Sequence, residues 1–265
     1  MATLVENINR AISDFDSIKG AIENNGVDVG NSPTNEYADK ILAGSDLFRN
    51  VISGTETDVK IPNGTTQIRP YAFYTYTALK KIEIPGSVVS IGRFAFRECP
   101  NIEEIILKDG IQVIGEQAFY SCSKVTSLEL PSSIRTIGNS AFRSCYGITE
   151  IIIPNGVQVI SDYAFANCSG LTKVSLPNTL TWIEVDSFYY TGNVTELNVE
   201  EGFNAPFLSL QAFTSLDADA LVNVINALAD RTNSDYGTLA LGSTNLSKLS
   251  DEQKALATEK NWILT

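Results

Sequence analysis

The sequence predicts a β-rich solenoid, with a small helical N-terminal module before it and an α/β C-terminal cap after it. A short phrase recurs every 23 residues between Val59 and Phe213, and several columns of residue types keep the same period. The clearest column is a small–large apolar pair, found at Ala72-Phe73, Ala95-Phe96, Ala118-Phe119, Ala141-Phe142 and Ala164-Phe165, and continued by Ser187-Phe188 and Ala212-Phe213. Such a period indicates a repeat architecture, in which each unit, or rung, buries its apolar side only by stacking on its neighbours.

Each rung contains two segments that read as short strands. The first has the pattern Leu/Ile-x-x-Ile-x-Ile/Leu-Pro, as at Leu79, Ile82 and Ile84. Its period-two alternation predicts a strand with one buried face, and the proline ends the strand because it cannot donate a ladder hydrogen bond. A second apolar pair, such as Ile111 and Ile114, predicts another short strand before the glycine and the Ala-Phe pair. By period and pattern, residues 51–213 therefore form a leucine-rich-repeat solenoid.

The same phrase connects the chain with a known family. The pattern A-F-x-x-C-x-x-L-x-x-I-x-L-P-x-x-V-x-x-I-G resembles the BspA-type leucine-rich repeats, which occur in surface proteins of gut and oral bacteria, their phages and some protozoa. The resemblance implies a BspA-like solenoid with 23-residue rungs and a role in adhesion or recognition. It implies no fixed set of functional residues.

Residues 1–50 are predicted to form a helical module for attachment or oligomerisation. Apolar residues recur at helical spacing over residues 3–24, namely Val5, Ile8, Ile12, Phe15 and Ile22. This spacing fits either packing on the end of the solenoid or a heptad seam that Lys19 interrupts. The phrase S-D-F-D-S-I-K-G-A-I-E-N-N-G-V-D-V-G, followed by Y-A-D-K-I, resembles an N-terminal module of virion and tail proteins of phages that infect gut Firmicutes. That resemblance implies a component of a particle.

From residue 214 to residue 265 the 23-residue period is lost and helix signals return. The signals predict two helices and two strands: helices capped by Ser215 or Asp217 and by Ser250, and strands over 238–241 and 262–264. We expect this segment to cap the solenoid, whose last rung would otherwise expose its core and a strand edge. It resembles the C-terminal module that follows such repeats in phage-encoded proteins.

Composition excludes some classes of partner. The chain has 265 residues, 43% of them hydrophobic, and a net charge of −12. Acidic residues outnumber basic ones in all three predicted segments, so no basic stripe exists to bind nucleic acid. The sequence begins without a basic apolar leader and contains no stretch long enough to span a membrane, which predicts neither a signal peptide nor membrane insertion. We therefore expect a protein that works inside a cell, or one that leaves it within a particle assembled there.

The residues that could support chemistry are few. Histidine is absent, and the four cysteines, Cys99, Cys122, Cys145 and Cys168, share one column of the repeat. Because successive rungs lie about 4.8 Å apart, the thiols form a straight file that cannot converge on one tetrahedral zinc ion. Parallel side-chain vectors also oppose disulfides, so buried free thiols are predicted. With no phosphate loop, nucleophile elbow or metal motif, the sequence predicts no cofactor and no enzyme activity.

Two columns of outward side chains are the candidate binding surfaces. On the first strand of each rung, carboxylates are interspersed with apolar residues that we expect to be exposed, at Glu104, Ile106, Glu129, Glu150 and Ile152. After each phenylalanine, tyrosine and arginine alternate at Tyr74, Arg97, Tyr120 and Arg143, and after Ala166 the column continues with Tyr189. This second column fits a cation–π ladder or a stripe that binds protein or sugar. Both columns also fit ordinary solvated rung ends.

These observations favour a non-enzymatic structural or recognition protein. The setting they favour is a phage virion, in its tail, baseplate or surface decoration, assembled in the host cytoplasm. There the solenoid would bind other virion proteins, further copies of itself, or a host surface protein or glycan. The alternative is a bacterial BspA-like adhesin exported by a non-classical route, or an intracellular scaffold for protein interactions. An enzyme is the least favoured class.

Overall fold

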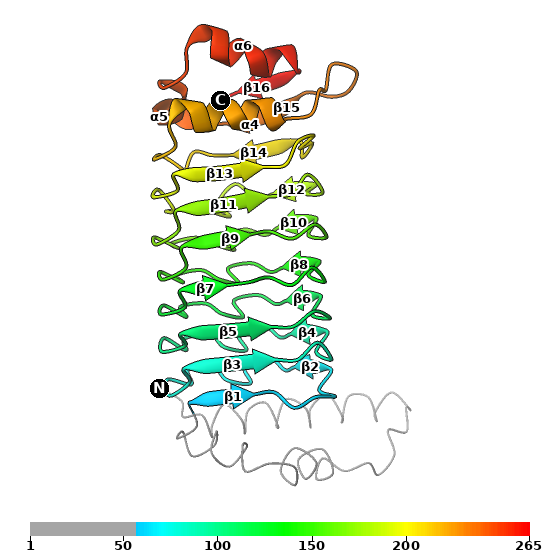
Figure 1. The fold of residues 1–265 in the computed structure, drawn as a ribbon, viewed down its shortest axis with the longest axis vertical. Helices are drawn as coiled ribbons and strands as arrows, with labels where there is room; N and C mark the ends of the chain where they lie inside the picture. The colour runs from blue at the N-terminus through cyan, green and yellow to red at the C-terminus, as the bar shows by residue number, and fades with distance from the viewer. Residues whose placement is uncertain (1–56) are drawn as a thin grey trace, which may run out of the picture.

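The structure of the protein is a computed structural model that describes residues 57–265. The helical module predicted for residues 1–50, with its apolar positions from Val5 to Ile22, lies outside the described residues. Figure 1 shows the rungs stacked along the long axis of the molecule, with the C-terminal helices at one end of the stack. The predicted β-rich leucine-rich-repeat solenoid is confirmed.

One side of the solenoid is built from the first strand of each rung. These strands are β1 Asp58–Lys60, β3 Lys81–Ile84, β5 Glu104–Leu107, β7 Ser127–Leu128, β9 Glu150–Ile152, β11 Lys173–Leu176 and β13 Glu196–Val199. All pairings are parallel and keep the 23-residue register, as between Ile82 and Ile105. The ladder has one interruption, since β1-β3-β5-β7 and β9-β11-β13 form separate sheets.

A second side is a continuous six-stranded parallel sheet of two-residue strands. They are β2 Gln67–Ile68, β4 Ser90–Ile91, β6 Val113–Ile114, β8 Thr136–Ile137, β10 Val159–Ile160 and β12 Trp182–Ile183. The glycine that follows allows the rungs to approach closely. A Cβ on Gly115 would lie 2.8 Å from the carbonyl oxygen of Ile91 and from the amide nitrogen of Arg93 in the preceding rung. A larger residue would therefore push two rungs apart.

The third side consists of turns around the Ala-Phe pairs, and its hydrogen bonding was not predicted. Around Phe96, both Phe94 and Glu98 have left-handed backbone conformations, with φ of 57° and 59°. The N–H groups of Phe94, Phe96 and Glu98 donate to carbonyls of the next rung at 2.9, 2.7 and 2.8 Å. Equivalent bonds link the other rungs, so the solenoid is hydrogen-bonded between rungs on all three sides.

The core is dominated by a file of phenylalanine rings. From Phe73 to Phe188 the six rings stack nearly parallel, with centroids 4.9–5.5 Å apart and interplanar angles of 2–12°. The prediction of buried thiols beside this file is confirmed, because all four cysteines are buried and free. Each thiol donates to the carbonyl of a phenylalanine in the preceding rung, as Cys122 does to Phe96 at 3.3 Å.

The C-terminal cap contains the predicted α/β elements and two more. Its elements are β14 Phe207–Ser209, α4 Ala218–Ala227, β15 Gly237–Ala240, α5 Gly242–Leu246, α6 Asp251–Glu259 and β16 Trp262–Leu264. Asp217 is the N-cap of α4, and Ser250 forms the expected capping box with Gln253. The unpredicted elements are the five-residue α5 and β14, which lies within residues 51–213, predicted as solenoid, and pairs with β15 in the same sheet as β16. None of the helices in residues 57–265 is long and apolar enough to cross a lipid bilayer.

Buried polar groups fasten the cap to the last rung. The Nδ2 group of Asn245, fully buried in α5, donates to the carbonyls of Leu210 and Phe213 at 3.0 and 3.4 Å. The ammonium group of Lys248 donates to the Asn245 Oδ1 atom at 3.0 Å and to two backbone carbonyls, those of Thr214 and Leu216, at 2.8 and 2.6 Å. The Lys248 bonds supply donors to the Thr214 and Leu216 carbonyls, and the Asn245 bonds add a second donor to the Leu210 and Phe213 carbonyls, which also accept from the N–H groups of Phe213 and Leu216.

Replacing Asn245 with alanine should therefore lower the free energy of unfolding. Two buried carbonyls would each lose one of two donors, and a typical hydrogen bond contributes about 0.5–1.5 kcal/mol. Urea unfolding followed by circular dichroism measures the change, and Thr244→Ala, at an exposed position of the same helix, is the control. An equal loss in both variants would show that Asn245 does not fasten the cap.

Candidate binding surfaces

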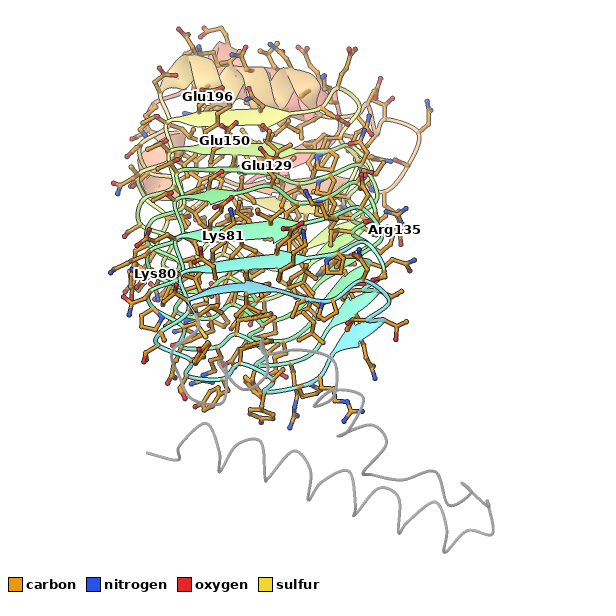
Figure 2. The ribbon with its side chains drawn as sticks, turned by 60° about the horizontal axis from the view of Figure 1, so that its bottom comes forward. Lys80, Lys81, Glu129, Arg135, Glu150 and Glu196 are labelled. Carbon is orange, nitrogen blue, oxygen red and sulfur yellow. The ribbon has the colours of Figure 1, made fainter. Side chains whose placement is uncertain are left out.

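The outward side chains of β1, β3, β5, β7, β9, β11 and β13 form a charged surface, the strand face. Near one end Lys60 pairs with Glu83 at 3.1 Å and Lys81 with Glu104 at 2.7 Å. Near the other end Lys173 lies between Glu150 and Glu196, at 3.3 and 3.1 Å. Figure 2 shows Lys81, Glu129, Glu150 and Glu196 on this face, with Arg135 on a different side of the solenoid.

These ion pairs affect the protonation of their members. The hydrogen bonds that Lys173 donates to Glu196 and Glu150 raise the pKa of Lys173, and the one that Lys81 donates to Glu104 raises that of Lys81. The pKa of Glu196 is lowered, first by the Asn198 amide and then by Lys173. Both ends of the strand face therefore satisfy their charges internally.

The centre of the strand face breaks this pattern. Ser127 stands where a lysine would pair with Glu104 or Glu150, and Glu129 is exposed without an ion pair or hydrogen bond to any residue of 57–265. In the neighbouring rungs the same column holds Ile106 and Ile152. Ile152 is 57% exposed, whereas Ile106, which we expected to be exposed, is half-buried in register with Glu83. We call Ile106, Glu129 and Ile152 the central patch.

A shallow depression adjoins the central patch. It has a volume of about 520 Å³ and is lined by Ile152, Ser175, Asn198 and the prolines that end β9 and β11, Pro154 and Pro177, among others. The interruption of the first sheet lies on the other side of β9, between the rungs of Glu129 and Ile152. The surface therefore offers the apolar Ile152 with an unpaired carboxylate, Glu129, in the rung on one side of it and a hollow on the other side.

The tyrosine–arginine column lies on the third side of the solenoid, which we call the turn face: the residues two before and one and two after each core phenylalanine. Tyr74, Arg97, Tyr120 and Arg143 are half-buried there. The Cζ atom of Arg97 lies 4.7 Å from the centroid of the Tyr120 ring. That of Arg143 lies 6.0 Å from the same ring and 5.1 Å from the ring of Tyr163.

Sequence reasoning missed half of this arrangement. The rings beneath the arginines come partly from the left-handed position two residues before each phenylalanine, which holds Tyr71, Phe94 and Tyr163. The 23-residue period of that position was a usable signal. Ala166 is fully buried and interrupts the column, and Tyr189 beyond it is 41% exposed. Through most of its length, then, the column is satisfied by the protein's own cations and rings.

The buried thiols are unsuited to chemistry. Burial raises the pKa of Cys99 and Cys168 to about 12 and that of Cys122 and Cys145 well above the ordinary value. Residues 57–265 contain no group of three or more histidine, cysteine, aspartate or glutamate side chains that could hold a metal ion. The described surfaces are suited to non-covalent binding.

A comparison with protein families identifies the repeats. The model of the BspA type leucine rich repeat region matches in six copies, over residues 43–168 and 89–216. The chain belongs to the BspA-type leucine-rich repeat family. Leucine-rich-repeat proteins generally mediate protein–protein interactions, and this family and fold are typically non-enzymatic. No curated protein matches the chain.

Solved structures include similar solenoids. A leucine-rich repeat protein of T. pallidum, TpLRR, is 28% identical with a TM-score of 0.57, and the alignment covers 63% of this chain and 81% of that one. A leucine-rich cell surface protein of Faecalibacterium prausnitzii is 29% identical with a TM-score of 0.40, covering 54% of this chain and 32% of that one. A leucine-rich repeat protein of Bacteroides ovatus is 24% identical with a TM-score of 0.46, covering 69% and 57%. This chain thus spans about a third of the second protein and little more than half of the third.

Proposed function

We propose that this protein is a non-enzymatic recognition protein that binds a partner protein through the central patch of its strand face. The observation that supports this is the local loss of charge pairing. At the two ends of the face a partner would have to desolvate or displace existing ion pairs. At the centre it meets the exposed Ile152 and the unpaired Glu129.

The central patch sets the chemistry of the partner. An apolar side chain packed on Ile152 gains from the removal of both surfaces from water. A lysine or arginine beside it gives Glu129 the counter-charge that it lacks within the chain. We therefore expect the partner to present an apolar residue flanked by a basic one.

We further propose a phage virion, in its tail, baseplate or surface decoration, as the setting. The resemblance of residues 1–50 to virion modules supports this, and many copies on one particle would let weak contacts to virion proteins, or to a host protein or glycan, add through avidity. The bacterial source of TpLRR supports the alternative, a BspA-like adhesin or an intracellular scaffold of a bacterium.

A cross-linking experiment tests the proposal, and the buried thiols make it selective. Ile152→Cys provides a reactive surface thiol, while the four native thiols are buried. The full chain, labelled there with a benzophenone maleimide, is irradiated with particles and with cells from the source culture. We expect one protein adduct, and the fraction that yields it distinguishes a virion from a cellular setting.

Two controls make the result decisive. Tyr236→Cys places the same probe on the cap, at a residue as exposed as Ile152, 59% against 57%, and should give no adduct. Glu129→Lys, made in the Ile152→Cys protein, should reduce the adduct at least fivefold, while Glu259→Lys on the exposed side of α6 should not. Equal adducts from positions 152 and 236 would refute binding through the central patch.

A further inference from the structure

On the turn face, arginine side chains of the chain itself lie over aromatic rings. Arg93 lies over Tyr71 at 5.6 Å and over Phe94 at 5.4 Å, and the rings of Tyr120 and Tyr163 have a guanidinium group from Arg97 or Arg143 within 6.0 Å. The Nε atom of Arg143 is buried without a hydrogen-bond partner among the described residues. The guanidinium group of Arg143 instead lies over the rings of Tyr120 and Tyr163. In these rungs the protein covers its own half-buried rings with its own cations.

The rung from Trp182 to Tyr190 departs from this pattern. Eleven large hydrophobic residues of 57–265 are exposed, and four of them lie in this rung: Trp182 at 44%, Val185 at 58%, Tyr189 at 41% and Tyr190 at 66%. Tyr189 and Tyr190 have ring centroids 4.1 Å apart, and Tyr163 meets Tyr189 edge-on at 6.1 Å. Within residues 57–265 no arginine or lysine lies over the rings of Tyr189 and Tyr190. We call Tyr163, Tyr189 and Tyr190 the aromatic patch.

Carboxylates predominate among the charges around the aromatic patch. The hydroxyl of Tyr163 donates to Asp186 Oδ2 at 3.1 Å. The pKa of the neighbouring Asp162 is raised, first by burial and then by the charges of Asp186 and Glu184. Among residues 57–265, Arg143 is the one cation that acts on Asp162, and it already lies over Tyr163. Within the described part of the chain, three carboxylates thus share one cation, and the rings of Tyr189 and Tyr190 beside them have no cation over them.

We propose that the aromatic patch binds a protein segment that presents arginine or lysine side chains. An incoming guanidinium group over Tyr189 and Tyr190 would repeat the contact that Arg97 makes with Tyr120, and the surrounding carboxylates would balance its charge. The aromatic patch lies on the turn face, so this site is separate from the central patch. It assigns a second partner-binding surface and the chemistry of its ligand.

The test uses a peptide of six Arg-Gly repeats, titrated into the full chain by isothermal calorimetry at physiological ionic strength. The double variant Tyr189→Ala/Tyr190→Asn gives this rung the residues of the preceding one, Ala166 and Asn167, and an asparagine already occupies the same left-handed position there, with φ of 59°. It leaves the net charge unchanged. We expect it to weaken binding about tenfold, since two cation–π contacts are lost.

The control and the contrary results are equally specific. Tyr146→Ala removes another exposed tyrosine, 50% exposed, from a position outside the aromatic patch and should leave the affinity unchanged. Unfolding midpoints of both variants report whether the fold is kept. An unchanged affinity in the double variant would overturn the proposal. It would show that the peptide binds through general attraction to a chain of net charge −12 and not through the aromatic patch. Binding of maltohexaose or chitohexaose that is lost in the double variant, with no such effect on the peptide, would assign the patch to a glycan instead.

Discussion

Replacing Phe142 with alanine should be among the most damaging single changes in the solenoid. Its ring is fully buried and stacks on Phe119 at 5.4 Å and on Phe165 at 5.5 Å. Loss of a buried phenylalanine ring typically costs about 3–5 kcal/mol, because a cavity remains where the surroundings cannot collapse. Here the hydrogen bonds between rungs hold the backbone on three sides, so little collapse is expected.

The damage should also depend on position along the stack. In a repeat protein each rung is stabilised mainly by its two neighbours, so a central defect weakens the coupling between two halves. Phe73 stacks on one described phenylalanine, Phe96, and is only partly buried. We therefore expect Phe73→Ala to cost about half as much as Phe142→Ala. Urea unfolding of both variants, with Ile152→Ala as the exposed control, measures this, and equal losses at positions 142 and 73 would contradict the role of stacking.

The sequence predicted the solenoid well because period and burial follow from the same constraint. A buried position packs against the same position of the next rung, so it can hold only residue types that pack well on one another. Repetition of one residue type every 23 residues therefore indicates burial, as it does at Phe96, Cys99 and Ile105. The cap helices were predictable for another reason, since Asp217 and Ser250 carry local capping chemistry. Long-range context was not needed for either.

Contacts between residues of different columns were not predictable in the same way. The period places Arg97 and Arg143 in one column, yet it does not say that Phe94 and Tyr163 of another column lie beneath them. That proximity depends on the left-handed residues on each side of the phenylalanine, and none of these is glycine. The short helix α5 escaped prediction because its role is tertiary, with Asn245 meeting carbonyls more than 30 residues away in the chain.

The second large effect concerns alkaline pH. The pKa values of all four thiols are raised in the folded protein, to about 12 for Cys99 and Cys168, whereas the ordinary value is 9.0. Above pH 9 the unfolded chain releases these protons and the folded protein keeps them, so proton release favours unfolding. The thiols therefore do not lower the free energy of unfolding below pH 9, and they lower it progressively as the pH rises from 9 towards 12. The expected slope is about 1.4 kcal/mol per thiol per pH unit.

Urea unfolding at pH 8, 9, 10 and 11 measures this slope. Raised pKa values of Lys81, Lys173 and Tyr163 act in the same direction, so a difference between proteins is needed to isolate the thiols. The double variant Cys122→Thr/Cys145→Thr copies Thr191, which fills the same column fully buried, and it should lose about half of the thiol contribution to the slope. If both proteins lose stability equally between pH 9 and 11, the thiols do not couple folding to protons. A shallower slope in the variant would instead show that the stability of the stacked rungs depends on the buried thiols staying protonated and therefore neutral.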